Sequence, residues 1–355
     1  MKIAFPLISV ERSGGVRVIV EIAKQLANLG HSCCLILPAH RESPFPIHRD
    51  MKIVRMRDSG PGGPLAIGAG IFGLARAVPG DTEVIVASYY LTAYAAWLAK
   101  RKVRKARLFH VIQGYEPNYF RQKDRPRQWM SYYLARASYR LPLRKTAVSS
   151  WLAERLAADG CRDLAVIPNG VDRAVFRPDP AGRKAAESLI MTVGHRRPNR
   201  GYGDFIAALN LLRRKRRDFR VLALGLDRGA ETRGDVPFET FTPRDDEELA
   251  AAYRSALMFV SCSHEEGFGL TPLEAMSCGT AVVTTDSGGV RAFARDRENC
   301  LMAPVGDVPR IAAAMERLLD DEPLRAGLIA RGLETAEVLN WAKIGRQYER
   351  EFSKE

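Results

Sequence analysis

Short apolar runs alternate with helical stretches along the whole chain, and this alternation limits the fold more than any other feature. Strands are predicted at Lys2–Ser9, Ser32–Leu37, Glu83–Ser88, Arg107–Ile112, Thr146–Ser149 and Ala165–Ile167, and again at Leu189–Val193, Phe219–Leu224, Met258–Ser261, Ala281–Thr284 and Cys300–Ala303. Val16–Leu29 has the apolar spacing of a helix and stops at Gly30. Such a pattern predicts parallel sheets covered by helices on both faces.

The turn-forming segment Pro168–Asp172 interrupts this alternation. A chain of 355 residues also exceeds the roughly 250–300 residues at which one core stops growing. We therefore predict an N-terminal domain over 1–168 and a second domain over 169–335. Residues 336–355 are predicted to form a helix that returns to the first domain, because the helical pattern of Glu334–Phe352 has no strand partner. Ligands of such sheets bind at the carboxyl ends of strands, which places a cleft between the domains.

Cysteine usage and hydropathy indicate a cytoplasmic protein. The six cysteines are scattered and no pair has zinc-ligand spacing, as is typical of a reducing compartment. The N-terminal apolar run is short and passes directly into Glu11-Arg12, so it is interpreted as a strand and not as a signal peptide. No stretch approaches the roughly 18 apolar residues of a membrane span.

The net charge of +13 concerns partners and not the fold. Basic residues cluster at 100–107, 121–127 and 213–217. No nucleic-acid-binding module accompanies them, so no nucleic-acid partner is expected. The first two clusters flank aromatic residues such as Trp129 and Tyr133, a mixture that suits an anionic membrane surface. A solvated helix face and a peripheral membrane contact both remain open interpretations.

The segment Glu266–Glu274 contains the strongest chemical signal. Gly267 and Gly269 let the backbone approach a ligand closely, and a helix is predicted to follow with Thr271 as N-cap, Pro272 in its first position and Glu274 in its first turn. A helix N-terminus attracts a diphosphate. The Glu274 carboxylate could then accept hydrogen bonds from ribose hydroxyls, and Glu266 would face a sugar.

These residues resemble family 4 retaining glycosyltransferases (glycosyl transferases group 1). The resemblance rests on the spacing of Glu266 and Glu274, on the residues between and after them, on Pro168–Asp172, and on Gly14-Gly15 before the first helix. It covers essentially the whole chain. It implies the GT-B fold, an α/β architecture of two tandem doubly wound, Rossmann-like domains that face each other across a cleft. The first domain would bind the acceptor and the second the nucleotide sugar.

The resemblance also implies a role for each matching residue. Glu266 would bind the donor sugar, Glu274 the ribose, and Gly14 and Gly15 the diphosphate. The expected donor contacts are Gly14, Gly15, His195, Arg196, Arg200, Glu266, Gly267, Phe268, Gly269, Leu270, Thr271 and Glu274. The expected catalytic residues are Glu266, Arg200, Arg196 and Gln113.

Two positions depart from the family pattern. Arg200 occupies the place of a lysine that neutralises the leaving diphosphate. The place of the accompanying arginine holds His195, so either Arg196 or a protonated His195 would supply that charge. Gln113 occupies the place of a histidine near the sugar, while His110 is either a core residue or a functional one. A Gln followed by Gly-Tyr-Glu resembles a subgroup associated with bacterial surface polysaccharides.

The resulting hypothesis is a retaining hexosyltransferase. It would move a hexosyl or deoxyhexosyl group from a UDP or GDP sugar to a hydroxyl of a glycan or lipid-linked saccharide, by front-face substitution. No cofactor and no metal are expected, because the arginines would substitute for a metal ion. Two alternatives remain open: a nucleotide-sugar 2-epimerase and a non-catalytic nucleotide-sugar-binding subunit of a glycosyltransferase complex.

Overall fold

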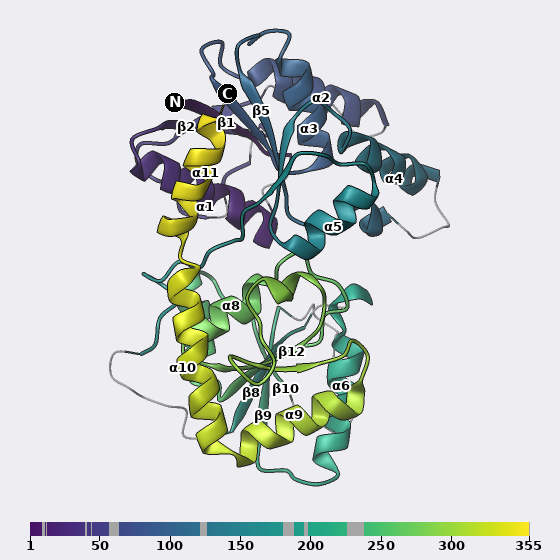
Figure 1. Cartoon of the computed structure of the whole chain (residues 1–355), viewed down its shortest axis with the longest axis vertical. Helices are drawn as coiled ribbons and strands as arrows, with labels where there is room; N and C mark the ends of the chain where they lie inside the picture. The colour runs from purple at the N-terminus through teal and green to yellow at the C-terminus, as the bar shows by residue number, and fades with distance from the viewer. Residues whose placement is uncertain are drawn as a thin grey trace. The chain divides into compact units, whose positions relative to one another are not determined.

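The chain folds into two compact units, each with its own sheet. The computed structural model describes residues 1–8, 11, 13–39, 41–43, 45–56, 64–120, 126–179, 188–194, 198–225 and 238–354. The first unit comprises Met1–Asn169 and Trp341–Glu355, and the second unit comprises Gly170–Asn340 (Figure 1).

In the described part of the first unit, seven strands form a parallel sheet in the order β3-β2-β1-β4-β5-β6-β7. They are β1 (Lys2–Pro6), β2 (Ser32–Leu37), β3 (Lys52–Arg55), β4 (Val84–Ala87), β5 (Arg107–Ile112), β6 (Arg144–Ala147) and β7 (Leu164–Val166). The register places Ile3 between Cys33 and Val84. The strand order reverses between β1 and β4, and in such sheets the ligand crevice lies at the carboxyl ends of the strands at this point.

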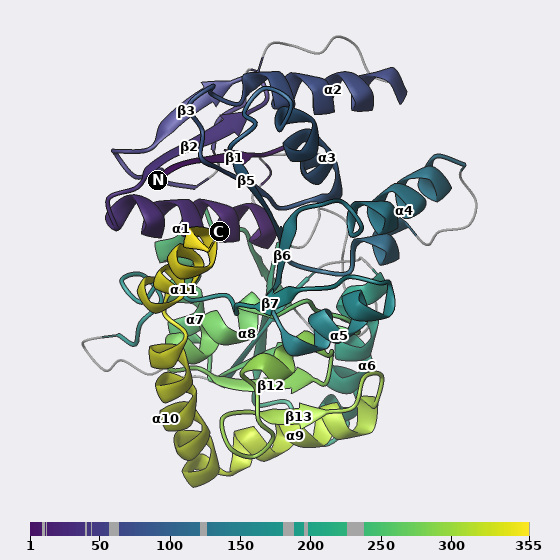
Figure 2. The same ribbon diagram turned by 45° about the horizontal axis from the view of Figure 1, so that its top comes forward.

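Helices cover both faces of the first sheet. They are α1 (Gly14–Asn28), α2 (Pro64–Ala77), α3 (Tyr90–Ala99), the 3-10 helix η1 (Glu116–Phe120), α4 (Pro126–Ser138), α5 (Ser150–Ala158) and α11 (Trp341–Ser353). Helices α2 and α3 share a core with Ala4 and Ile85 of the sheet. Helix α11 packs beside α1 (Figure 2), and the ring of its Phe352 lies 4.7 Å from the ring of Phe109 in β5.

The described strands of the second unit form a six-stranded parallel sheet in the order β10-β9-β8-β11-β12-β13. They are β8 (Leu189–Val193), β9 (Arg220–Leu224), β10 (Phe238–Phe241), β11 (Met258–Ser261), β12 (Ala281–Thr285) and β13 (Leu301–Ala303). Met258 pairs with Ile190 on one side and with Ala281 on the other. The order reverses between β8 and β11, so the loops after these two strands meet at one edge.

The helices of the second unit follow the same arrangement. They are η2 (Pro198–Arg200), α6 (Tyr202–Arg213), α7 (Asp246–Ser255), α8 (Leu270–Ser277), η3 (Gly289–Ala292), α9 (Val308–Asp320) and α10 (Glu322–Val338). Helices α6 and α9 share a core with Ile190, Val260 and Val283. Helices α8 and α10 pack against each other; α8 contacts β11 and β12, and α10 contacts β12.

The edge strands β3 and β10 were not predicted from the sequence. Most of their residues are exposed, so neither strand forms the apolar run typical of strands that are covered on both faces. The first strand ends at Pro6 and not at Ser9, and Ser149, predicted to end a strand, caps α5. The single helix predicted over Glu334–Phe352 was also wrong. The chain leaves α10 after Val338, and the Leu339 carbonyl accepts a hydrogen bond from the Val171 N–H at 2.8 Å before α11 begins.

Candidate active site

The first glycine pair lies where the chain leaves the loop after β1 and enters α1. Ser13 caps this helix, since its hydroxyl oxygen accepts a hydrogen bond from the Val16 N–H at 3.4 Å. Gly14 and Gly15 are the first two helical residues. Their N–H groups therefore lie in the first turn, where backbone N–H groups have no hydrogen-bond partner within the helix. Gln113, just beyond β5, donates from Nε2 to the Gly15 carbonyl oxygen at 3.0 Å. The structure thus brings three predicted site residues together at the carboxyl edge of the first sheet.

His110 is a core residue, which decides between the two interpretations of the sequence. Its side chain lies within β5 and is completely buried. Neither ring nitrogen has a hydrogen-bond partner among the described residues. Burial, and to a smaller extent the charge of Lys145, lower the pKa of His110 to about 3. The imidazole is therefore neutral over the physiological range and does not reach the edge of the sheet.

A buried carboxyl group follows Gln113 in η1. Glu116 is 3% exposed, and its Oε2 accepts a hydrogen bond from the Tyr90 N–H at 2.9 Å. Burial raises the pKa of Glu116 to about 8, and the hydrogen bond from Tyr90 opposes this rise. The Glu116 N–H donates to the Tyr139 hydroxyl at 3.1 Å. Glu116 thereby ties the segment after Gln113 to the start of α3, a role that no local pattern indicated.

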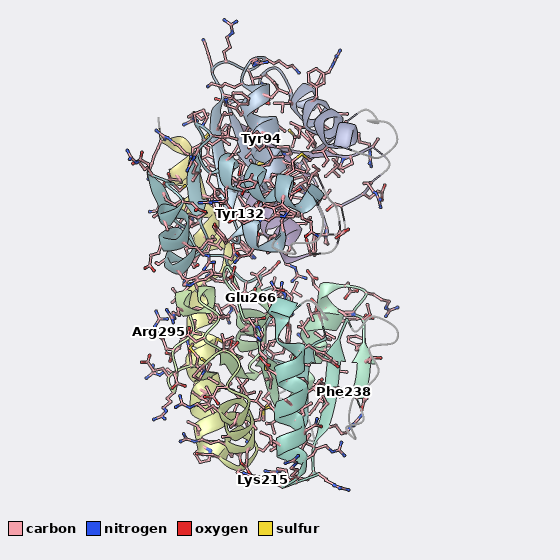
Figure 3. The ribbon with its side chains drawn as sticks, turned by 90° about the vertical axis from the view of Figure 1, so that its right-hand side faces the viewer. Tyr94, Tyr132, Lys215, Phe238, Glu266 and Arg295 are labelled. Atoms are coloured by element: carbon pink, nitrogen blue, oxygen red, sulfur yellow. The ribbon has the colours of Figure 1, made fainter. Side chains whose placement is uncertain are left out.

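Arg200 and Glu266 meet at the carboxyl edge of the second sheet. Arg200 ends η2 after β8, and Glu266 lies in the loop after the neighbouring strand β11. Their side chains form an ion pair through Nη1 and Oε1, and the Ser263 hydroxyl donates to the same Oε1 at 2.9 Å. Figure 3 shows Glu266 at one end of the second unit and Lys215 at the opposite end. A predicted phosphate-binding cation and a predicted sugar-binding carboxylate are thus in contact.

Further contacts join the loop after β11 to η2 and to the start of α6. The His264 Nε2 and the Asp204 Oδ2 are 2.7 Å apart, and the His264 N–H donates to the Asn199 carbonyl oxygen at 2.8 Å. Gly201 has a φ of 62°, and a Cβ at this position would lie 1.7 Å from the Cys262 carbonyl oxygen. Sequence reasoning missed Asp204 and His264, because their contact joins the first turn of α6 to a loop that is distant in the chain.

Gly289 packs closely against the backbone of the loop that contains Glu266. The Glu266 N–H donates to the Ser287 carbonyl oxygen at 3.0 Å, and the Gly289 N–H donates to the Glu266 carbonyl oxygen at 3.0 Å. A Cβ on Gly289 would lie 2.2 Å from the Gly267 carbonyl oxygen, so only glycine permits this approach. The adjacent pair Gly288-Gly289 was a visible signal in the sequence that the prediction did not use.

Helix α8 begins earlier than the sequence predicted. Thr271 is not the N-cap, because Gly269, with a φ of 97°, occupies that position and the helix starts at Leu270. Pro272 is consequently not the first helical residue, and the first turn contains no acidic residue, which leaves Glu274 in the second turn. The prediction failed because it assumed a side-chain cap, whereas a left-handed glycine turns the chain into the helix directly.

Glu274 is almost completely buried beside Tyr253. Glu274 is 5% exposed, and the Tyr253 hydroxyl donates a hydrogen bond to the Glu274 Oε2 at 3.2 Å. The Tyr253 ring packs on Phe176, whose carbonyl oxygen accepts a hydrogen bond from the Ser277 hydroxyl at 2.5 Å. Phe176 therefore joins the turn-rich segment before it to α8. The Phe268 ring packs on that of Phe293 at 5.1 Å, which holds the loop before the helix.

Several predictions concern residues or groups that the site geometry does not include. His195 and Arg196 lie outside the described residues. Across the described ranges, no cluster of three His, Cys, Asp or Glu side chains could hold a metal ion. All six cysteines are free thiols. Of the helices in the described part of the chain, none has both the length and the apolar character needed to cross a membrane.

Comparison with protein families adds to this geometry. A model of glycosyltransferase family 4 matches residues 12–175, and a model of glycosyl transferases group 1 matches residues 177–335. The chain belongs to the family 4 glycosyltransferases. The family predicted from the sequence is therefore confirmed, and this glycosyltransferase is nucleotide-sugar dependent, as its family is.

Curated relatives of this glycosyltransferase include enzymes that act on inositol compounds. A phosphatidyl-myo-inositol mannosyltransferase of Mycolicibacterium smegmatis is 32% identical over 213 residues, which are 57% of this chain and only 54% of the relative. A D-inositol 3-phosphate glycosyltransferase of Thermomonospora curvata is 28% identical, over 93% of this chain and 88% of the relative.

Solved structures of similar shape confirm the predicted GT-B fold. A sucrose-phosphate synthase of Thermosynechococcus elongatus has a TM-score of 0.82 at 19% identity, with 99% of this chain and 98% of that chain covered. Anabaena HepE in complex with UDP-glucose has a TM-score of 0.78 at 17% identity, with 99% of each chain covered. At these identities the likeness concerns the fold alone.

Proposed function

We propose that this glycosyltransferase moves a hexosyl or deoxyhexosyl group from a UDP or GDP sugar to a hydroxyl group of a glycan or lipid-linked saccharide, with retention of configuration. The observation that supports this most directly is the contact between Arg200 and Glu266 at the edge where doubly wound sheets bind ligands. We further propose a role in bacterial cell-surface polysaccharide or glycolipid synthesis, in keeping with relatives such as the phosphatidyl-myo-inositol mannosyltransferase.

The proposed roles give each member of the ion pair its own part of the donor. Glu266 accepts hydrogen bonds from the sugar hydroxyls, and Arg200 faces the diphosphate. Glu274, held by the hydrogen bond from Tyr253, accepts hydrogen bonds from the ribose hydroxyls. Gly14 and Gly15 present backbone N–H groups to the diphosphate from the first unit, and their position in the first turn of α1 supports this role.

We propose front-face substitution as the route to retention of configuration. The bond between the sugar C1 and the diphosphate oxygen breaks, and the acceptor hydroxyl oxygen bonds to C1 on the same face. The acceptor proton passes to the departing phosphate oxygen. Negative charge grows on the diphosphate in the transition state, so the Arg200 guanidinium stabilises the transition state more than the ground state. Gln113, held by its hydrogen bond to Gly15, is proposed to contact the sugar.

A transfer assay with single variants tests the proposal. Arg200→Ala and Glu274→Ala should each lower the transfer rate by about 100-fold or more, the usual cost of losing one transition-state donor or one anchor of the donor. Lys215→Ala, at the opposite end of the second unit, serves as a matched loss of charge and should leave the rate unchanged (Figure 3). Transfer that survives both site changes would contradict the assignment.

Two further measurements separate this proposal from its alternatives. Activity should persist in excess EDTA, because an arginine and not a metal ion neutralises the leaving group. An epimerase would exchange the proton at C2 of the sugar with solvent, and a non-catalytic subunit would bind donor without turnover. A thermal-shift screen against UDP, GDP, ADP and their sugars identifies the donor base, because ligands that bind only the folded state raise its apparent stability.

We also propose a peripheral contact with an anionic membrane surface. Trp129, Met130 and Tyr133 on α4 are 48%, 44% and 57% exposed, and the rings of Trp129 and Tyr133 stack at 5.9 Å. Exposed aromatic side chains of this kind favour the interface between lipid and water. The basic cluster at 121–127 immediately precedes them in the sequence, which adds attraction to anionic headgroups.

A further inference from the structure

A basic cavity of about 710 Å³ lies in the first unit, away from the residues described above. Arg107 begins β5 and Arg144 begins β6, so the cavity opens at the amino ends of these strands. Lys100, Arg101 and Arg104 contribute from the turn after α3, and Trp97 contributes from the helix itself. The two chain ends lie close to this position (Figure 1), where Arg107 also contacts Met1.

The described lining of this cavity is strongly basic. Its lining contains five cationic side chains and no carboxylate. Over the described ranges of the chain, none of the five forms an ion pair. Lys100 donates to the Ala106 carbonyl oxygen at 2.5 Å, and Arg107 and Arg144 both donate to the Lys354 carbonyl oxygen, at 3.2 Å and 2.7 Å. These carbonyl groups fix the orientation of the side chains without contributing a negative charge. Like charges held together in this way repel one another unless an anion binds.

The cavity is separate from the proposed donor contacts of the same unit. Gln113 follows the carboxyl end of β5, whereas Arg107 stands at its amino end. A strand of six residues spans about 20 Å at 3.3 Å per residue. A ligand at Arg107 therefore cannot be the diphosphate that the first turn of α1 would face. The basic residues at 100–107 also gain a role that the solvated-face interpretation did not give them.

We propose that this cavity binds a ligand with two or more adjacent phosphate groups. Guanidinium groups present paired N–H donors that match phosphate oxygens, and here several of them converge. The Arg101 guanidinium lies 5.9 Å from the centre of the Trp97 ring, which is itself 42% exposed. Trp97 thus offers a flat apolar surface beside the charged groups. The shared chemistry is an oligophosphate, which either a free phosphate compound or a lipid headgroup can supply.

Calorimetric titration with inorganic tripolyphosphate tests the first source. The double variant Arg101→Gln/Arg104→Gln removes two exposed cations that donate none of the hydrogen bonds above, so the fold should persist, as an unchanged thermal midpoint would show. The variant should bind at least about tenfold more weakly than the wild type, because a hydrogen bond to a charged group is lost at each position. The matched control Arg214→Gln/Arg217→Gln removes the same charge from exposed positions of the second unit and should bind as the wild type does.

Flotation with vesicles tests the second source. Vesicles of phosphatidylcholine with diacylglycerol diphosphate, a lipid whose headgroup carries two linked phosphates, would retain the wild type and the control but not the Arg101/Arg104 variant if a lipid headgroup is the ligand. The proposal is overturned if the Arg101/Arg104 variant binds tripolyphosphate and the vesicles as well as the control variant does. It is also overturned if neither tripolyphosphate nor the vesicles bind the wild type. The Arg200→Ala variant should keep this binding, and the Arg101/Arg104 variant should keep transfer activity, so failure here is distinguishable from failure of the proposed function.

Discussion

Individual site residues in this glycosyltransferase depend on neighbours that hold them in place. Glu266 receives both Arg200 and the Ser263 hydroxyl on one carboxylate oxygen, and Gly289 fixes its backbone. Glu274 is held by Tyr253, and Gln113 is held against Gly15. These contacts orient polar side chains before a ligand arrives, which lowers the cost of ordering them on binding. They also separate positions that touch the ligand in our proposal from buried polar residues that only shape the fold.

His110 belongs to the second kind, and His110→Leu tests this. The variant should keep full transfer activity and equal or higher stability at neutral pH, because it removes two buried nitrogens without partners. The folded-state pKa of about 3 lies below the ordinary value of 6.5, so the wild type loses stability as pH falls from 6.5 toward 3. Urea unfolding at pH 7 and pH 4 should show a loss from this group of up to ~3 kcal/mol that the variant lacks. Loss of activity without loss of stability would instead give His110 a chemical role.

Glu116 should act in the opposite direction. Its folded-state pKa of about 8 lies above the ordinary 4.5, so its contribution to stability is full below pH 4.5 and is lost as pH rises to 8. Glu116→Gln can still accept the hydrogen bond from Tyr90 and cannot ionise. The variant should therefore gain ~3 kcal/mol relative to the wild type between pH 5.5 and pH 8 in urea unfolding. If the free energies of unfolding of the wild type and the variant changed with pH in the same way, the raised pKa of Glu116 would be contradicted.

At the scale of elements, the C-terminal helix α11 is part of the first unit. Gly345 lies so close to α1 that a Cβ would stand 2.5 Å from the Gln25 Cβ. The His31 Nε2 and the Glu349 Oε1 are 2.8 Å apart on the same contact. The chain reaches this position after completing the second unit, so the first unit is closed only when residues from both ends of the sequence meet.

Gly345→Ala tests how much this helix contact contributes. The added methyl group should lower the free energy of unfolding by about 1–3 kcal/mol, because it forces two packed backbones apart. Gly327→Ala in α10 is a matched control, since nothing lies within 4 Å of its added Cβ, and it should be neutral or stabilising by up to ~1 kcal/mol. Denaturant unfolding followed by circular dichroism compares the two, and equal effects would show that α11 is only loosely attached.

For the whole molecule, the distribution of charge matters more than its sum. The net charge of +13 includes the ion pairs of the second unit, such as Lys215 with Glu316, and the basic cavity at the amino ends of β5 and β6. The exposed aromatic residues of α4 form a different surface of the first unit. These surfaces should therefore respond to different ligands and different variants.

Membrane association through α4 can be measured by co-sedimentation with phosphatidylglycerol vesicles. The double variant Trp129→Ser/Tyr133→Ser should lower the partition coefficient between vesicles and solution by about tenfold, because two exposed rings no longer enter the interface. Val338→Ser removes an apolar side chain that is 65% exposed in the second unit and should have no effect. Binding of the wild type should weaken at high salt, which screens the basic contribution. Equal partitioning of the two variants would exclude α4 as the contact.

The sequence by itself determined the two parallel sheets, the family and the residue types at the candidate site. Periodicity and turn chemistry are local, so they are visible without coordinates wherever a strand is covered on both faces, and they disappear at the exposed edges β3 and β10. The cap of α8 was mistaken because a left-handed glycine and a hydroxyl cap leave similar traces in a sequence.

Only the tertiary structure decided which residues meet. Arg200 and Glu266 are 66 positions apart, and their contact exists because strand order places β8 beside β11. The same folding buried His110, enclosed Glu116 and gathered the cations around Arg107 and Arg144. The physical reason is that a residue's environment is set by chain crossings that no local pattern records, while the pattern records only whether each segment is suited to strand, helix or turn.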